Sequence, residues 1–212
     1  MSDRYTLYGA PGWGSVIAEL MLTWCRAPFD LVDVDGFDQP GPARDRLLAL
    51  NPLAQVPTLV LPSGEVMTES AAIALLLSET YPDAGLAPPP GSSDRARFLR
   101  WLVWLTAAVY PTFTYADYPD RWAPESGQDF VRRVDGHKQD LWRQFDTALR
   151  PDPWCLGDAF SALDIYLIPM TRWRPRRDWF AEHLPRLHAV ALAAESLPVL
   201  SPVVERNFGA AA

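Results

Sequence analysis

The spacing of apolar and polar positions predicts alternating strands and helices over the first eighty residues. Apolar residues recur at steps of three and four between Ser15 and Trp24, which is the spacing of a helix, and short apolar runs on either side are typical of strands. The predicted strands are Arg4–Tyr8, Phe29–Val34, Thr58–Leu61 and Glu65–Met67, and the predicted helices are Ser15–Trp24, Ala43–Leu50 and Ser70–Thr80. This order of elements predicts a mixed sheet with helices packed on it.

In the second half of the chain the apolar spacing is helical throughout. A long helix begins near Phe98, and Pro111 must kink or end it because proline has no amide hydrogen. A second long helix spans 130–149. A third begins near Ser161, where Ser161 and Asp164 fit a capping box with Asp in place of the usual Glu. Further helices are predicted near 187–195 and 199–206.

The composition changes most sharply at Ala87 to Ser93, which reads APPPGSS. Prolines and glycine cannot continue a helix or a central strand, so this stretch predicts a domain boundary. We expect an α/β domain over residues 1–83, a Pro-rich linker over 84–93 and an all-helical domain over 94–212.

The overall composition is that of a globular protein, with 49% hydrophobic and 21% charged residues in 212. A formal net charge of −7 argues against a nucleic-acid surface, and we interpret the basic run Arg172–Arg177 as a solvated helix end or a clamp for acidic neighbours. Cys25 and Cys155 are far apart and have no metal-ligand spacing, which indicates a reducing compartment and no metal site. The start of the chain lacks the pattern of a signal peptide, and no apolar run approaches the length of a membrane span, so we expect a cytoplasmic protein.

Pro57 stands at the threshold of a predicted strand, directly after Val56. A cis bond between them would turn the Val56 backbone outward, where its amide and carbonyl can pair with an extended peptide ligand. The alternative is an ordinary turn proline in trans, the form that most X-Pro bonds adopt. The residues alone leave both open.

Glu69 and Ser70 open the next predicted helix. A helix N-terminus attracts a carboxylate because its free amides and its dipole favour negative charge, and Ser70 adds a hydroxyl donor. Glu69 beside it can hold an ammonium, so the pair suits the charged end of an amino acid. The alternative is simple helix capping.

Together these motifs resemble the N-terminal domain of bacterial-type cytosolic glutathione transferases. The matching residues are Asn51-Pro52, Val56-Pro57-Thr58-Leu59 and Glu69-Ser70-Ala71-Ala72-Ile73, and the likeness continues through RARFLRWLVWL, YPDRWAP, LGDAFSALDIYL and ERNF. The resemblance implies a thioredoxin-like N-terminal domain and an all-α C-terminal domain. It also implies a cytoplasmic homodimeric glutathione S-transferase that conjugates glutathione to a hydrophobic electrophile in detoxification, with no metal and no nucleic-acid or membrane partner.

The resemblance assigns roles to individual residues. It implies that Pro57 is cis and that the Val56 backbone binds the cysteinyl part of glutathione. Glu69 and Ser70 would bind its γ-glutamyl end, and Gln55 would lie near its glycyl end.

The group that activates the thiol departs from the family pattern. Family members use a Tyr, Ser or Cys in the first strand or at the start of the first helix, but Gly12 and Gly14 occupy the positions of the Ser and Cys types. Ser15 is the nearest hydroxyl, and Tyr8 matches the tyrosine of other classes. Lowering a thiol pKa by about two units requires roughly 2.7 kcal/mol, which a helix N-terminus and one hydrogen bond can supply. The candidates are Ser15, Tyr8, or the backbone amides of Gly14 and Ser15 alone.

Trp13 lies between two glycines and is a candidate wall of an electrophile pocket, with Tyr110 and Phe113 opposite. Its alternative role is packing against the helical domain. Two other functions stay open: glutathione-dependent isomerisation or disulfide reduction on the same fold, and a non-catalytic binding or regulatory scaffold, which Gly12 and Gly14 motivate.

Overall fold

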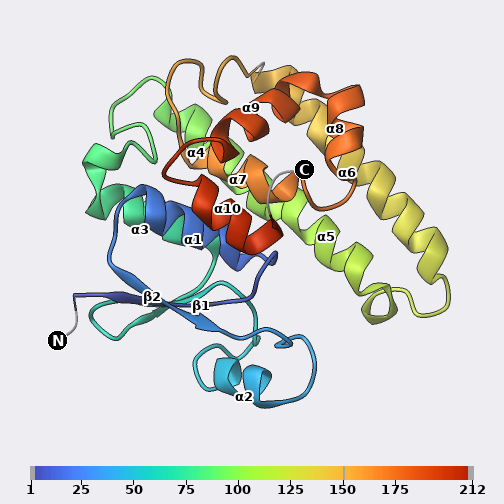
Figure 1. Ribbon diagram of the computed structural model, residues 1–212. Coiled ribbons are helices and arrows are strands. Elements are labelled where there is room, and N and C mark those ends of the chain that lie inside the picture. Colours follow the sequence, from blue (N-terminus) through green and yellow to red (C-terminus); the bar gives the residue numbers. More distant parts are fainter. Residues whose placement is uncertain (1–2, 150, 210–212) are drawn as a thin grey trace. The chain divides into compact units, whose positions relative to one another are not determined.

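The computed structural model describes residues 3–149 and 151–209. The chain forms two compact units, which we describe separately (Figure 1). Of the described residues, the first comprises 3–86 together with 195–209, and the second comprises 87–149 and 151–194. Among the described residues, no helix is long and apolar enough to cross a bilayer.

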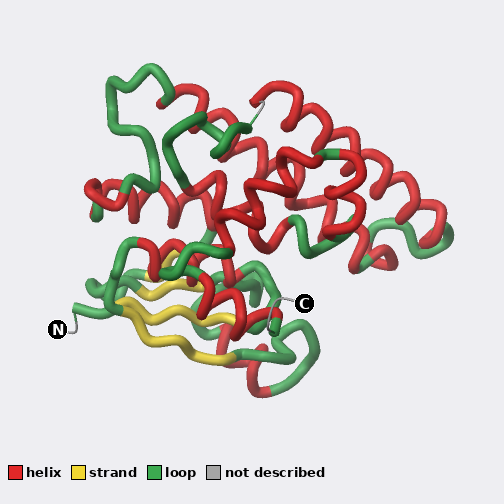
Figure 2. Tube along the Cα trace, turned by 45° about the horizontal axis from the view of Figure 1, so that its top comes forward, coloured by secondary structure: helices red, strands yellow, loops and turns green. Residues whose placement is uncertain are grey.

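The first unit is built on a four-stranded mixed sheet in the order β2-β1-β3-β4 (Figure 2, yellow). Its elements are β1 (Tyr5–Gly9), α1 (Ser15–Trp24), β2 (Phe29–Asp33), α2 (Pro42–Leu48), β3 (Thr58–Val60), β4 (Val66–Met67), α3 (Ser70–Thr80), the 3₁₀ turn η1 (Pro82–Ala84) and α10 (Ser201–Phe208). Strand β1 pairs in parallel with β2 and antiparallel with β3, and β3 and β4 form an antiparallel hairpin. The predicted thioredoxin-like domain is confirmed.

The two faces of the sheet are covered by different helices (Figure 1). In β1, Tyr5 and Leu7 are buried, whereas Thr6 and Tyr8 point to the other face and are half-buried. Helices α1 and α3 pack together, and α1 is buried along nearly its whole length. Leu47 of α2 belongs to a small apolar cluster on the face of Tyr8, whose other buried members are Ala10, Val34, Phe37 and Ala54.

The second unit is helical, as predicted. Its elements are α4 (Arg95–Trp104), the π-helical turn η2 (Leu105–Val109), α5 (Tyr110–Asp117), the 3₁₀ turn η3 (Pro119–Arg121), α6 (Gly127–Leu149), α7 (Ala162–Met170), α8 (Arg177–His183) and α9 (Pro185–Glu195). Pro111 interrupts the first long helix in the way that its missing amide requires. Regular α-helical bonding stops at Trp104 and resumes at Tyr110, and the wider π turn between them accommodates the proline in the first turn of α5.

The predicted capping box at the start of α7 is present. The Asp164 carboxylate accepts from the Ser161 amide at 2.8 Å, and the Ser161 hydroxyl accepts from the amides of the first helical turn. Asp164 also accepts from the Cys155 amide at 2.7 Å, a bond that the sequence did not indicate. The carboxylate therefore fastens the preceding loop to α7.

Burial gives Asp164 a pH-dependent effect on stability. Burial raises the pKa of its carboxyl to about 6, although the hydrogen bonds from Cys155 and Ser161 act in the opposite direction. The folded state therefore holds this proton at pH values where the unfolded chain has released it. We expect the free energy of unfolding to fall by up to roughly 3 kcal/mol as the pH rises from about 4 to about 6.

Chemical denaturation of the wild type and of Asp164→Asn gives the free energy of unfolding of each across this pH range. The difference between the two pH profiles measures the effect of Asp164. Parallel profiles would contradict this prediction.

The segment 195–209 lies with the first unit and not with the helical domain to which the sequence assigned it. Helix α10 packs against α1, where Glu19 is only 3% exposed. A buried carboxylate requires a partner, and Arg206 forms an ion pair with Glu19. No local pattern in the sequence indicates this long-range pair.

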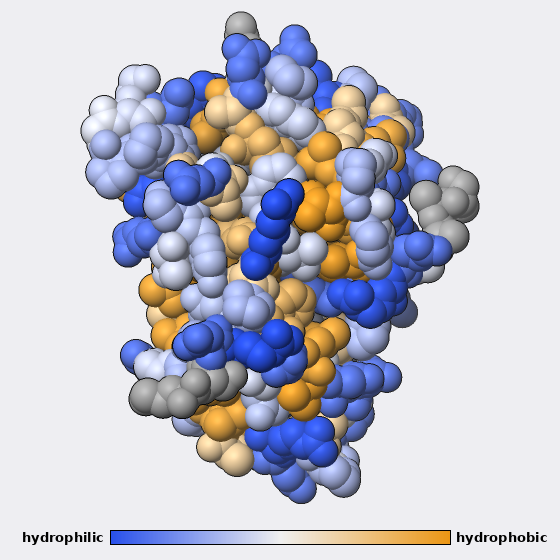
Figure 3. Space-filling view, turned by 60° about the vertical axis from the view of Figure 1, so that its left-hand side comes forward, coloured by the Kyte–Doolittle hydropathy of each residue, from blue (hydrophilic) through white to orange (hydrophobic). Residues whose placement is uncertain are grey.

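Exposed apolar side chains are spread over both units. They are Leu31, Leu48 and Leu53 in the first and Val103, Trp122 and Leu192 in the second. On the face drawn in Figure 3, orange apolar residues lie between blue hydrophilic ones. Such scattered residues are normal on a protein surface and do not by themselves indicate a ligand.

Candidate functional site

The predicted ligand-binding residues of the first unit meet at one end of its sheet. In the register, Tyr8 of β1 faces Thr58 of β3, and Leu59 faces Met67 of β4. The end of β1, the start of β3 and the end of β4 therefore lie at the same end of the sheet. The loop 10–14, the segment 55–57 and the start of α3 follow directly from these strand ends.

Two uncapped helix N-termini lie at this end. Neither α1 nor α3 has a capping hydrogen bond from the side chain of its N-cap residue or an acidic residue in its first turn. Among the described residues, the amides of Gly14 and Ser15 at α1 and of Ala71 and Ala72 at α3 have no hydrogen-bond partner. Free amides and the helix dipole make both positions favourable for negatively charged groups.

The Ser15 hydroxyl is already committed to the loop. Ser15 is 3% exposed, and its Oγ accepts from the Ala10 amide at 3.0 Å and donates to the Ala10 carbonyl at 3.2 Å. A Cβ at Gly9 would lie 2.8 Å from this oxygen, so glycine is required there. A hydroxyl has one proton to donate. The arrangement therefore favours the amides over the hydroxyl as donors to a ligand.

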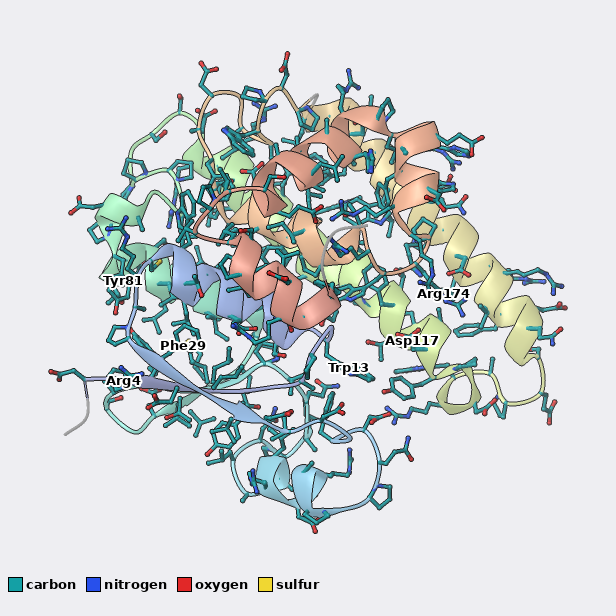
Figure 4. The ribbon with its side chains drawn as sticks, viewed as in Figure 1. Arg4, Trp13, Phe29, Tyr81, Asp117 and Arg174 are labelled. Carbon is teal, nitrogen blue, oxygen red and sulfur yellow. The ribbon has the colours of Figure 1, made fainter. Side chains whose placement is uncertain are left out.

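Tyr8 and Trp13 lie on the face of the sheet that α2 covers. Both pack against the apolar cluster around Phe37, and the Trp13 ring meets the Phe37 ring edge-on at 5.0 Å between centroids. Figure 4 shows Trp13 at the loop between β1 and α1. Among the described residues, the Tyr8 hydroxyl has no hydrogen-bond partner. Trp13 thus belongs to the packing of its own unit, beside the candidate ligand site.

The segment 55–57 before β3 is held by hydrogen bonds to the Gln55 carbonyl. The Val56–Pro57 bond is cis, as the resemblance implied. The Gln55 carbonyl accepts from the Asn51 side chain at 3.2 Å and from the Thr58 hydroxyl at 2.8 Å. Among the described residues, the amide and carbonyl of Val56 have no partner, and the Gln55 side chain is exposed. Val56 thus retains both groups that an extended ligand needs.

Glu69 has an unusual backbone conformation at the start of α3. Its φ is 62° and its ψ is 102°, although it is not a glycine. A non-glycine residue held in a sparsely populated region costs about 1–3 kcal/mol and is found preferentially at functional sites. Its side chain is exposed and, among the described residues, accepts only a long hydrogen bond, 3.4 Å, from the Thr68 hydroxyl. Glu69 was a candidate from the sequence because of its charge, but nothing in the sequence indicated this backbone conformation.

Tyr110 and Phe113, the predicted pocket residues of the second unit, meet in an aromatic group. Their ring centroids are 6.1 Å apart, and each also packs edge-on against Trp173, at 5.7 and 5.2 Å respectively. Tyr110 is half-buried, but Phe113 is only 6% exposed. Phe113 therefore packs beneath Tyr110 and Trp173 and contributes little to an open surface.

A buried lysine lies behind these rings. Lys138 is fully buried, with its ammonium 4.7 Å from the Phe113 ring centroid and 3.0 Å from Asp135. Burial lowers its pKa, and Asp135 acts in the opposite direction. Burial also raises the pKa of Asp117, which Figure 4 labels together with Arg174. Arg174 binds Asp135 at 3.2 Å. Arg174 thus acts as the predicted clamp for an acidic neighbour, whereas nothing in the sequence indicated that Lys138 is buried.

Neither cysteine has the environment of a reactive thiolate. Cys25 and Cys155 are both buried, and burial raises the pKa of Cys25 to about 12 and that of Cys155 well above its ordinary value. In the described part of the chain, no group of three or more His, Cys, Asp or Glu side chains is placed to hold a metal ion.

Comparisons with known proteins match this arrangement. Residues 15–80 match the family described as glutathione S-transferase, N-terminal domain. The chain is 46% identical over 201 residues to an uncharacterised GST-like protein, YncG, of Escherichia coli K12, covering 95% of this chain and 97% of that relative. It is 30% identical over 167 residues to the glutathione S-transferase GstA of Escherichia coli O157:H7, covering 79% of this chain and 81% of GstA. A solved sphingomonad glutathione S-transferase complexed with glutathione is similar with a TM-score of 0.78 and 29% identity, over 97% of this chain and 100% of that one.

Proposed function

The chain belongs to the glutathione S-transferase family, and we propose that it is an enzyme that binds glutathione, stabilises its thiolate and conjugates it to a hydrophobic electrophile. The observation that carries the proposal is the pair of uncapped helix N-termini at one end of the sheet, with the unpaired Val56 backbone at the same end. Glutathione is an extended peptide with anionic groups at several points, so it suits such an arrangement.

Each part of the ligand has a proposed partner. The amide and carbonyl of Val56 pair with the cysteinyl residue, beside cis-Pro57. The γ-glutamyl carboxylate is held at the start of α3 by Ser70 and the free amides that follow it, while Glu69 binds the ammonium. Gln55 is exposed near the glycyl end.

We propose that the amides of Gly14 and Ser15 stabilise the thiolate, with the Ser15 hydroxyl shaping the loop. A free thiol has a pKa near 8.5 and is only a few per cent ionised at pH 7. A helix N-terminus contributes up to about 2 kcal/mol and a hydrogen bond to a charged group about 1.5–3 kcal/mol. Two amides therefore suffice for a shift of about two units, which needs roughly 2.7 kcal/mol. Thiolate formation and proximity then supply most of the rate.

The proposal extends to the rest of the molecule by family resemblance. The electrophile binds at an apolar surface of the second unit to which Tyr110 contributes, with Phe113 supporting it. The enzyme is a cytoplasmic homodimer with a role in detoxification, and glutathione is its co-substrate.

Isothermal titration with glutathione, together with a pH titration of the ultraviolet absorbance of the bound thiolate, tests the proposal. We expect binding and a thiol pKa about two units below that of free glutathione. Absence of binding at millimolar glutathione would contradict it. Binding without turnover of any member of a panel of electrophiles and disulfides would favour the non-catalytic scaffold.

Two hydroxyl deletions separate the candidate donors. Because the amides remain in place, we expect Ser15→Ala and Tyr8→Phe each to shift the pKa of bound glutathione by less than about half a unit. The same absorbance titration measures this. A rise of about two units in either variant would identify that hydroxyl as the donor and refute the amide proposal.

A further inference from the structure

Asn207 of α10 connects the C-terminal helix to the loop 10–14. Its Oδ1 accepts from the Gly12 amide at 3.2 Å. Its Nδ2 donates to Glu19 Oε2 at 2.8 Å and to the Val203 carbonyl at 2.9 Å. Both hydrogens of the Nδ2 group and the oxygen are thus in use.

These contacts fix which way the side-chain amide points. In the flipped orientation the NH₂ group would face the Gly12 N–H, and the oxygen would face the Glu19 carboxylate. Both contacts would be repulsive, because each would pair two donors or two acceptors. Asn207 Oδ1 therefore faces the loop, because only this orientation pairs each donor with an acceptor.

Glu19 anchors the arrangement from within α1. It is 3% exposed, lies one helical turn after Ser15, and is bound by both Arg206 and Asn207. Arg206 balances its charge, which would otherwise disfavour a second negative charge at the start of the same helix. Figure 1 shows α10 beside α1, and both belong to the first unit.

The loop itself is held at three points. Ser15 binds Ala10 at one end, and the Trp13 amide donates to the Ala10 carbonyl at 3.2 Å. Gly12, with φ at 77°, is held by Asn207. Within the described residues, the amides of Gly14 and Ser15 at the end of this loop have no hydrogen-bond partner.

We infer that Asn207 is a positioning residue for thiolate stabilisation: by binding Gly12 it holds the Gly14 and Ser15 amides where the sulfur of glutathione binds. The inference rests on the proposed function. Helix α10 would then affect ionisation of the thiol and have no part in recognition of the peptide part of the ligand. Loss of Asn207 should therefore change the ionisation of the thiol and leave the rest of binding intact.

The test compares Asn207→Ala with Glu205→Ala. Glu205 is exposed on the same helix, and its side chain forms no hydrogen bond with any residue that the structure describes, so it is the matched control. In Asn207→Ala we expect the pKa of bound glutathione to rise by about 0.5 to 1 unit and kcat at pH below this pKa to fall about three- to ten-fold. The Kd of S-methylglutathione, which has no thiol, should change less than about two-fold. Glu205→Ala should match the wild type in all three measurements.

The outcomes separate this inference from the proposed function. Wild type that binds no glutathione would refute the proposed function itself. Wild type with a lowered thiol pKa, combined with an Asn207→Ala variant indistinguishable from Glu205→Ala, would overturn the positioning role alone. A parallel weakening of S-methylglutathione binding would also overturn it, because it would indicate a general loss of structure.

A measurement on the wild type decides the matter if Asn207→Ala does not fold. Amide hydrogen exchange, followed by NMR, should find Gly12 protected in the ligand-free protein because its amide is bound to Asn207. Exchange at the rate of an unstructured peptide would overturn the inference.

Discussion

Replacing Asp164 by alanine should lower the free energy of unfolding by roughly 3–5 kcal/mol, the largest effect on stability that we expect of a single residue outside the core. The carboxylate accepts from the Cys155 amide, the Ser161 amide and the Ser161 hydroxyl, and all three donors are buried. Each donor left unsatisfied costs about 1–3 kcal/mol. The loss is a large part of the 5–15 kcal/mol that typically stabilises a domain. Urea denaturation followed by circular dichroism measures it.

Asp158→Ala is the control for this change. Asp158 belongs to the same loop but is exposed, and within the described part of the chain its side chain forms no hydrogen bond. Its replacement should alter stability by less than about 0.5 kcal/mol. If both variants lost the same stability, the loop as a whole and not the bonds of Asp164 would be responsible.

The features that the sequence predicted well are those that depend on neighbouring residues. The capping box needs only Ser161 and Asp164, three positions apart. The strands predicted at 58–61 and 65–67 are neighbours in the chain, and the structure joins them by a turn in which Gly64 has a positive φ. Pro111 acts through its own missing amide. In each case the physical cause lies within one or two turns of chain, so the pattern of residues is sufficient.

The features that it did not predict depend on residues far apart in the chain. Arg206 and Asn207 reach Glu19 across nearly the whole sequence, and this contact places α10 with the first unit. A lysine at the helix position of Lys138 would be expected at the surface from the sequence. The structure shows that it is buried against the Phe113 ring and Asp135. Ser15 was predicted as a candidate donor to the thiol, but only the structure shows that its hydroxyl already binds Ala10.

The two ends of the proposed ligand therefore depend on different parts of the chain. In the proposed function, recognition of the peptide uses Val56, Glu69 and Ser70, which lie close together in the sequence. The proposed ionisation of the thiol instead uses the loop 10–14, whose Gly12 amide is bound by Asn207, about two hundred residues away. A change in the first set should alter affinity, and a change in the second should alter the thiol pKa.

Replacing Glu69 by glutamine should raise the Kd of glutathione roughly 5- to 30-fold, which corresponds to about 1–2 kcal/mol. The substitution keeps the size of the side chain and removes the charge that we propose binds the γ-glutamyl ammonium. The range is below that of a buried charge pair because Glu69 is exposed. Isothermal titration measures the change, and Glu65→Gln, an exposed glutamate on the β3–β4 hairpin, should bind as the wild type does.

A ligand change makes this prediction specific to the ammonium. Deamino-glutathione lacks only that group, so Glu69→Gln and the wild type should bind it with equal affinity. The four dissociation constants form a double-mutant cycle, which then gives the coupling free energy between the Glu69 carboxylate and the ligand ammonium. If Glu69→Gln weakened both ligands equally, Glu69 would act through the backbone at the start of α3, where its φ of 62° sets the direction of the first helical amides. The thiol pKa of bound glutathione should stay unchanged in either case, because the role that we propose for Glu69 is recognition of the peptide and not ionisation of the thiol.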